Sequence, residues 1–241
     1  MLYLFFLIKS MLSKLISSVQ LNMNLEQASP IKISTPLSFM QTELHGETMQ
    51  MQSWAWQSER IAFARLTHLH SPQRVQLFNF TIYPHTTYLG AMFASDWVVL
   101  NGKLRIGVMD AMPFFDTPAY ATHWIQPFEP LHQTSLAIAP VYVRTDDWSY
   151  QYLSPNACMA SQITDLTPLM LLWEQYLQQY LACLHTAPKA TVGEQERQQM
   201  WQAHYNQTHV EVELKRNPLL HYFGRELGEA YLKEFLFSNS F

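Results

Sequence analysis

The side chains that could do chemistry lie on either side of one short motif, Asn101-Gly102. Asn-Gly between two apolar runs is the strongest short signal for a two-residue hairpin turn, because both residues tolerate positive φ. Such a turn pairs Leu100 with Lys103 and, continued along both strands, places Asp96 opposite Gly107. The pattern therefore predicts a carboxyl group on a strand, beside a glycine that leaves room for a ligand close to the backbone.

Strand side chains alternate between the two faces of a sheet. In the predicted register, one face is uniformly apolar and would pack against a helix layer: Trp97, Val99, Leu104, Ile106 and Val108. The other face presents an acid, Asp96, and a base, Arg105, around Gly107. Two simpler interpretations stay open, namely a strand-end carboxylate turned to solvent and an ordinary surface arginine.

We expect no metal and no bound prosthetic group. His68 and His70 are two residues apart and would face one way on a strand, as metal ligands do, but no third ligand is evident. The two cysteines, Cys158 and Cys183, lack the spacing of a zinc or iron–sulfur site, and no GxGxxG nucleotide loop occurs.

The elements that position these residues are predicted from hydrophobic periodicity. Residues 43–112 have the pattern of strands, with one strand over 74–83 that Pro84 ends and two more over 92–100 and 103–110. The second half has helical spacing. Thr167-Pro168 is predicted as the N-cap and first position of an amphipathic helix that Pro188 ends, and further helices are expected over 194–215 and 225–237. The aromatic residues of 173–180 are predicted to be core.

Composition favours one domain and no nucleic-acid partner. The chain has 241 residues, of which 48% are hydrophobic, and a net charge of −4, so one sizeable core fits and no basic footprint is present. We expect residues 31–241 to form a single domain. Residues 1–30 are predicted to be a leader, which can be mobile, or a first helix; the apolar stretch 2–8 is too short to span a bilayer.

Several stretches, in their order and spacing, resemble the ferredoxin-dependent bilin reductases over residues 50–237. The stretches are Gln52-Ser-Trp54-Ala-Trp56 followed by Arg65, the run from Leu77 to Tyr88 with Asp96 eight residues later, Asp110-Ala-Met-Pro113, Tyr152-Leu-Ser154-Pro155, and Arg216 followed by Phe223-Gly224 and 231–237. The resemblance implies an α/β fold, a three-layer α/β/α sandwich with a central antiparallel sheet. It also implies that the linear tetrapyrrole lies between the sheet and the C-terminal helices.

The resemblance also assigns roles. It implies that Asp96 and Glu213 are catalytic, and that electrons come one at a time from external reduced ferredoxin through bilin radicals. A carboxyl group held protonated near neutrality needs a pKa shift of about three units, roughly 4 kcal/mol, which burial against an apolar ligand can supply. Asn79 would hydrogen-bond the bilin. From the predicted hairpin register, Arg105 would pair with a propionate and Gly107 would leave room for the bilin. Arg216 completes the expected substrate-binding set.

Asparagine at position 79 resembles the family members that make phycoerythrobilin, directly or through 15,16-dihydrobiliverdin. The chain departs from the family pattern over Tyr88–Asp96 and carries Glu213 where the family has an aspartate. These departures leave open a reductase of different regiospecificity, one similar to red chlorophyll catabolite reductase, or a bilin-binding carrier without catalysis. An unrelated α+β interaction protein is the remaining alternative.

Partners and location follow from the same resemblance. Basic residues near the C-terminus could dock an acidic ferredoxin, or could be solvated helix faces: Lys215, Arg216, Arg225 and Lys233. We expect a monomer, and handover with a second bilin reductase or with heme oxygenase is a further hypothesis. The expected compartment is the cytoplasm of a cyanobacterial-type cell, or the plastid stroma if residues 1–30 are a transit peptide.

Overall fold

The computed structural model describes residues 2–44, 46–71, 74–138 and 148–238, with side chains from residue 11 onward except that of residue 148. Within these residues, one eight-stranded sheet is antiparallel in all its pairings and has the order β1-β3-β4-β5-β6-β7-β8, while β2 pairs with β3 beside β1. The strands are β1 (Ser29–Pro30), β2 (Phe39–Leu44), β3 (Glu47–Gln57), β4 (Ile61–His70), β5 (Val75–Pro84), β6 (Met92–Leu100), β7 (Lys103–Met112) and β8 (Cys158–Ala160).

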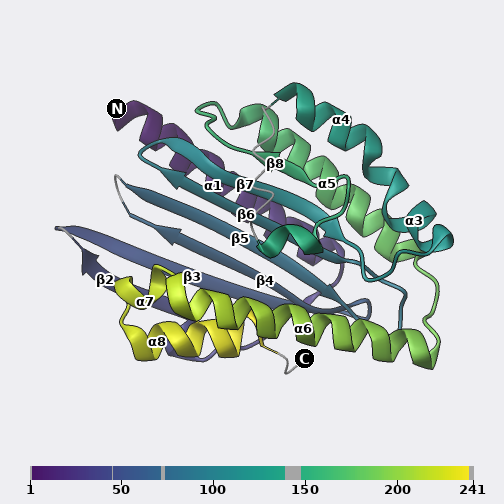
Figure 1. The fold of residues 1–241 in the computed structure, drawn as a ribbon. Helices are drawn as coiled ribbons and strands as arrows, with labels where there is room; N and C mark the ends of the chain where they lie inside the picture. The colour runs from purple at the N-terminus through teal and green to yellow at the C-terminus, as the bar shows by residue number, and fades with distance from the viewer. Residues whose placement is uncertain (1, 45, 72–73, 139–147, 239–241) are drawn as a thin grey trace.

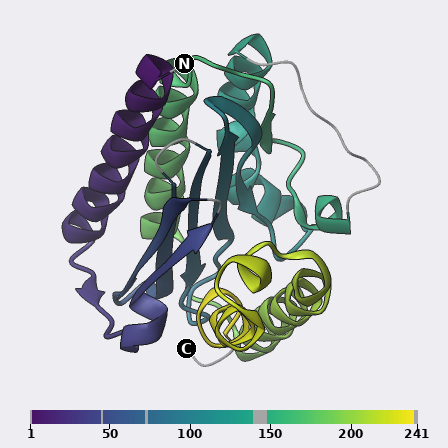
Figure 2. The same ribbon diagram turned by 90° about the vertical axis from the view of Figure 1, so that its left-hand side faces the viewer.

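Helices cover both faces of this sheet (Figures 1 and 2). One layer consists of α1 (Leu2–Leu25), α3 (Pro118–Trp124), α4 (Glu129–Ile138) and α5 (Thr167–Thr186). The other consists of α6 (Val192–Arg216), α7 (Leu219–Tyr222), α8 (Arg225–Ala230) and a π-helical turn, Tyr231–Leu236. The remaining elements are short: α2 (Thr35–Ser38) and two 3-10 turns, Gln126–Phe128 and Trp148–Tyr152. The three-layer α/β/α sandwich is therefore confirmed.

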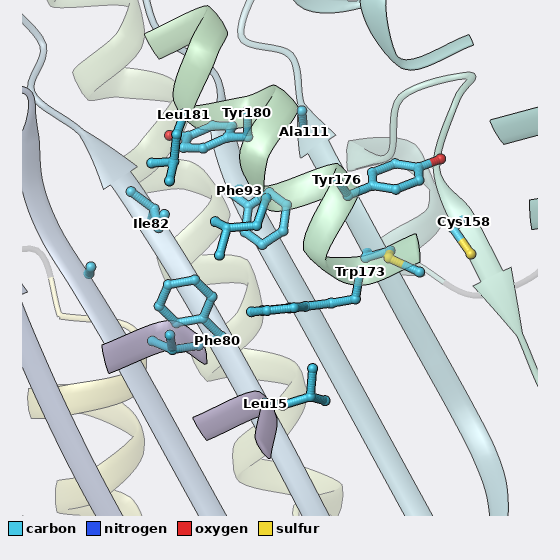
Figure 3. Close-up of a cluster of buried hydrophobic side chains, with 14 of the residues drawn as sticks. Leu15, Phe80, Ile82, Phe93, Ala111, Cys158, Trp173, Tyr176, Tyr180 and Leu181 are labelled. Atoms are coloured by element: carbon cyan, nitrogen blue, oxygen red, sulfur yellow. The ribbon is translucent and has the colours of Figure 1, made fainter. Parts of the chain in front are cut away.

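The larger core lies between the sheet and α5. Figure 3 shows Trp173 reaching from α5 toward Phe80 and Phe93 on the strands, and the ring centroids are 6.1 and 6.5 Å away. The indole N–H of Trp173 donates to Ser95 Oγ at 3.0 Å, and the Tyr180 hydroxyl donates to the carbonyl of Ala91, just before β6, at 2.9 Å. The polar tips of both rings thus have partners inside the core, and the aromatic residues of 173–180 are core, as predicted.

The predicted hairpin forms, but its register is wrong. Asn101 and Gly102 have φ of 53° and 77°, and Leu100 pairs with Lys103. A β-bulge then shifts the pairing, because Val99 opposes Leu104 while Val98 opposes Ile106, which leaves Arg105 as the extra residue of β7.

The bulge reverses the faces of β7. Asp96 lies opposite Val108, not opposite Gly107, whose partner is Trp97. Ile106 and Val108 therefore share the face of Asp96, and Gly107 lies on the opposite face. A Cβ atom at Gly107 would come within 2.9 Å of the Leu104 side chain, so this glycine makes room for a core side chain and not for a ligand above Asp96.

The helices differ from the sequence predictions at their ends. The N-cap of α5 is Leu166, one residue before the predicted Thr167, and Asp165 Oδ1 accepts the N–H of Thr167 at 3.0 Å. The helix expected to start near residue 194 begins at Val192, because Thr191 and Glu194 form a capping box. The expected final helix is divided into α8 and the π-helical turn.

The N-terminal helix packs on the α5 layer. Leu12, Leu15, Val19 and Met23 are fully buried, and Gln178 Nε2 of α5 donates to Asn22 Oδ1 at 2.6 Å. Whether residues 1–30 act as a leader stays a prediction. Among the described residues, every helix is too short or too polar to cross a membrane.

Candidate active site

Four neighbouring strands place one polar side chain each in a row across the sheet. Ser53 of β3 pairs with Thr67 of β4, Thr67 pairs with Asn79 of β5, and Asn79 pairs with Asp96 of β6. Directly paired residues of neighbouring strands point to the same face of a sheet, so these four side chains share one face. The C-terminal helices cover this face, because the hydroxyl of Tyr231 contacts Ser53 and Thr67. We call Ser53, Thr67, Asn79 and Asp96 the polar row.

Asp96 has the properties of a proton donor. The Asn79 amide Nδ2 donates to Asp96 Oδ1 at 3.2 Å. Burial raises the pKa of Asp96 to about 6, and the negative charge of Glu213 adds to this rise, whereas the Asn79 hydrogen bond and the charge of Arg65 lower it. Because the carboxyl group is half-buried on the face that the C-terminal helices cover, it can carry a proton at a mildly acidic pH.

Arg65 is buried beside the polar row, with 1% of its surface exposed. Its guanidinium Nη1 donates to Asn79 Oδ1, and its guanidinium carbon lies 5.6 Å from the centre of the Phe237 ring. Among the described residues, its Nε–H has no hydrogen-bond partner. The sequence pointed to Arg65 only within a family motif; the available signal was a charged residue in the apolar run Ile61–Leu69.

Tyr231 closes the other end of the row. Its hydroxyl lies 2.7 Å from Ser53 Oγ and 2.6 Å from Thr67 Oγ1, and its ring is fully buried. Burial raises the pKa of Tyr231 to about 12, so the hydroxyl stays protonated. Tyr231 is the first residue of the π-helical turn, and such irregular turns are frequent at functional sites. No sequence pattern pointed to this contact.

Asp110 joins two motifs that the sequence shows separately. One carboxylate oxygen accepts the backbone N–H of Ser154 at 2.6 Å and the other accepts the Ser154 hydroxyl at 2.5 Å. Burial raises the pKa of Asp110 to about 6, against the lowering effect of these bonds. Asp110 pairs with Ala94, two residues along β6 from Asp96. Its role is to anchor the chain after the sheet near the site.

The structure brings some predicted site residues together and separates others. Glu213 of α6 is close enough for its charge to act on Asp96, and its carboxylate also accepts from Asn217 Nδ2 at 2.7 Å. Arg216 is exposed and lies 3.5 Å from Glu213. Arg105 is exposed at the bulge, and Gly107 faces the other layer. The predicted hairpin register, which put Arg105 and Gly107 on the face of Asp96, is therefore wrong, because the bulge adds one residue to β7.

Comparison with known proteins agrees with this architecture. The family model described as ferredoxin-dependent bilin reductase matches residues 15–238. The chain belongs to this family.

Relatives of this bilin reductase cover most of its length. It is 28% identical to a phycoerythrobilin:ferredoxin oxidoreductase of Gloeobacter violaceus, over 84% of this chain and 85% of the relative. It is 25% identical to a 15,16-dihydrobiliverdin:ferredoxin oxidoreductase of Nostoc punctiforme, over 79% of each. The crystal structure of phytochromobilin synthase from tomato in complex with biliverdin shares the fold, with a TM-score of 0.81, 16% identity, and coverage of 94% of this chain and 83% of that one.

The bilin reductase has a hollow on the face of the polar row. It measures about 290 Å³ and lies between the β2–β3 hairpin, the start of β5 and α7, where Glu47, Arg74 and His221 line it. Val75, also in its wall, faces the same way as Asn79, four residues further along β5. The hollow does not reach Asp96. The polar row is therefore the candidate site, because it contains a carboxyl group whose pKa is raised by burial.

No cluster suited to a metal is found in the part of the bilin reductase that the structure describes. His68 and His70 stack with ring centroids 4.9 Å apart, and His68 lies 3.2 Å from Gln76. His68 is on the face opposite the polar row, since Thr67 is its neighbour on β4. These histidines are therefore not part of the candidate site.

Proposed function

We propose that this bilin reductase reduces biliverdin or 15,16-dihydrobiliverdin to a phycoerythrobilin-type bilin, with Asp96 as the proton donor. Electrons come from reduced ferredoxin, as the family description states. The relatives named for phycoerythrobilin and for 15,16-dihydrobiliverdin, together with asparagine at position 79, support this substrate class. A bilin is a conjugated ring system that accepts electrons itself, so the protein must supply protons, orientation and electrostatics.

The observation that carries the proposal is the state of Asp96. Its carboxyl group is at the centre of the sheet, hydrogen-bonded by Asn79, with a pKa of about 6 before any ligand is present. A flat apolar ligand laid over the row would remove more water from the carboxyl group and raise its pKa further. The acid is then protonated near neutral pH and can protonate a bilin radical after the first electron arrives.

The segment Tyr88–Asp96, where the sequence departs from the family pattern, is fixed by hydrogen bonds at Tyr88 and Gly90. The Gly90 N–H donates to Gln198 Oε1 at 2.8 Å, and the Gly90 carbonyl accepts the Tyr120 hydroxyl at 2.6 Å. The Tyr88 hydroxyl donates to Glu59 at 2.5 Å. These contacts fix the backbone of the connection that leads into β6, the strand that carries Asp96.

The enzyme carries no prosthetic group of its own in this proposal, acts as a monomer, and works where reduced ferredoxin is found, in a cyanobacterial-type cytoplasm or a plastid stroma. Handover of bilin with a second reductase or with heme oxygenase belongs to the same proposal. Basic residues at the end of α6, at the start of α8 and in the π-helical turn would meet acidic ferredoxin. Several of them are already paired, Arg225 and Lys233 with Glu229 at 2.7 and 3.0 Å. We therefore expect only a moderate fall of turnover at limiting ferredoxin as salt rises.

Anaerobic turnover of wild type and Asp96→Asn with biliverdin and with 15,16-dihydrobiliverdin tests the proposal. Asparagine is nearly isosteric, so ligand binding should persist, while the rate should fall by about a hundredfold or more. A bilin radical should accumulate and be visible by electron spin resonance. Wild-type rates in the variant with both substrates would rule out Asp96 as the obligatory donor, and a stable bilin spectrum in the wild type after addition of reduced ferredoxin would identify a carrier.

A further inference from the structure

The orientation of the Asn79 amide is decided by Arg65. A guanidinium group has five N–H donors and no acceptor, so the Asn79 atom that faces it must be the amide oxygen. Arg65 Nη1 donates to that oxygen, Oδ1. The amide nitrogen Nδ2 then points to the other neighbour of Asn79, which is Asp96 across the β5–β6 pair.

This orientation decides where the proton of Asp96 is. Nδ2 can only donate, so Asp96 Oδ1, 3.2 Å away, must accept. The carbonyl oxygen of a neutral carboxyl group is a better acceptor than its hydroxyl oxygen, so the bond from Nδ2 favours Oδ1 as the carbonyl oxygen and the O–H on Oδ2. Without Arg65, the neutral acid and the amide could also pair the opposite way, with the acid proton donated to the amide oxygen and withheld from a ligand.

We propose that Arg65 is a positioning residue, which fixes the direction of the Asn79-to-Asp96 hydrogen bond and thereby keeps the acid proton on Asp96 Oδ2. The inference rests on the proposed function, because it concerns how the donor Asp96 is prepared. Arg65 would act without touching the reacting atoms. Arg65 is paired with Thr81 on β5, two residues from Asn79, so its buried guanidinium lies diagonally across from the Asn79 side chain.

Arg65 is suited to this role because its own position is fixed. It is buried in β4, Phe237 lies over its guanidinium, and Asn79 is within hydrogen-bond reach. The charged groups that act on Asp96 come from two elements: Arg65 of β4 lowers its pKa, and Glu213 of α6 raises it. Tyr205 of α6 also interacts with the charge of Asp96, and burial keeps the Tyr205 pKa high, so that this phenol is neutral.

Infrared spectroscopy of the carboxyl C=O stretch tests the inference without ligand and without turnover. The Asp96 band is the one that appears on acidification in the wild type and is missing in Asp96→Asn. In the wild type, it should lie at the lower frequency of a hydrogen-bonded carbonyl. Asn79→Leu provides the free-carbonyl reference, since leucine has the shape of asparagine without its donors. A wild-type band at the frequency of Asn79→Leu would overturn the proposal.

Arg65→Met keeps an unbranched side chain but has no hydrogen-bond donor, so it should shift the Asp96 band or split it in two. Arg65→Lys keeps a charged donor and should leave the band near its wild-type position. The pH profile of turnover in Arg65→Met should move to higher pH, because the cation that lowers the Asp96 pKa is gone. At its optimum, kcat should also fall, by up to about a hundredfold, since the acid proton is no longer held in one position. An unshifted band in a folded Arg65→Met refutes the role of Arg65.

The two proposals fail in different ways. If Asp96→Asn turns over at the wild-type rate, the proposed function fails, although the infrared bands can still show the predicted hydrogen-bond direction. If Asp96→Asn is inactive but the bands of wild type, Arg65→Met and Asn79→Leu coincide, only the inference about Arg65 fails. Circular dichroism of each variant confirms that the comparison is made on folded protein.

Discussion

Replacing Asp96 with asparagine should stabilise the protein at neutral pH and leave its stability almost unchanged under acid conditions. Burial raises the pKa of Asp96 from 3.8 to about 6, so the folded state binds this proton more tightly than the unfolded state does. Stability from this group is therefore highest below about pH 4 and is lost as the pH rises through about 6. The amide of the Asp96→Asn variant is neutral at every pH and avoids that loss.

The size of the effect follows from the pKa. A shift from 3.8 to about 6, at 1.36 kcal/mol per unit, amounts to about 3 kcal/mol of destabilisation once the carboxyl group is ionised in both states. The new amide oxygen in Asp96→Asn can still accept from Asn79 Nδ2, so the hydrogen bond need not be lost. We expect the variant to exceed the wild type by up to about 3 kcal/mol in free energy of unfolding above about pH 7.

Urea unfolding followed by circular dichroism measures this difference at about pH 4.5 and about pH 7.5. Asp110 also has a raised pKa, but it is present in both proteins and cancels in the comparison. A stability difference that is the same at both pH values, or that favours the wild type at the higher one, would refute the argument that Asp96 is ionised at a cost in the folded state. The expected gain in stability, with loss of turnover, is the trade-off common to active-site residues.

Three further changes have expected outcomes. At about pH 4, where the cost of ionising buried Asp110 is largely absent, Asp110→Asn should destabilise the protein by about 1–3 kcal/mol in urea unfolding, because a single amide oxygen replaces the two oxygens that accept from Ser154; an unchanged midpoint at that pH would contradict the anchoring role. Tyr231→Phe should cost a similar amount, about 1–3 kcal/mol, by leaving Thr67 Oγ1 and its neighbour on β3 without their shared partner, and equal stability of the two proteins would argue against that contact. Glu213→Gln should lower the pKa of Asp96 and move the pH profile of turnover to lower pH, since a neighbouring negative charge is removed; a shift the other way would show that Glu213 does not act through its charge.

The sequence by itself determined the local elements. The turn at Asn101-Gly102 follows from two residues that tolerate positive φ, and α5 follows from apolar spacing that brings Trp173 and its neighbours to one face. The family motifs that contain Asp96 and Asn79 were likewise visible along the chain. Each of these depends on residues close together in sequence, where backbone preference and periodicity act directly.

The tertiary structure decided which of these residues meet. One bulged residue, Arg105, moved Gly107 to the opposite face, because a sheet has a side-chain period of two and any single insertion reverses every later position. The partners Arg65 and Tyr231 reach the polar row from another strand and from a turn far along the chain. Their positions depend on long-range packing and on the cost of leaving buried polar groups unpaired, neither of which has a local pattern in the sequence.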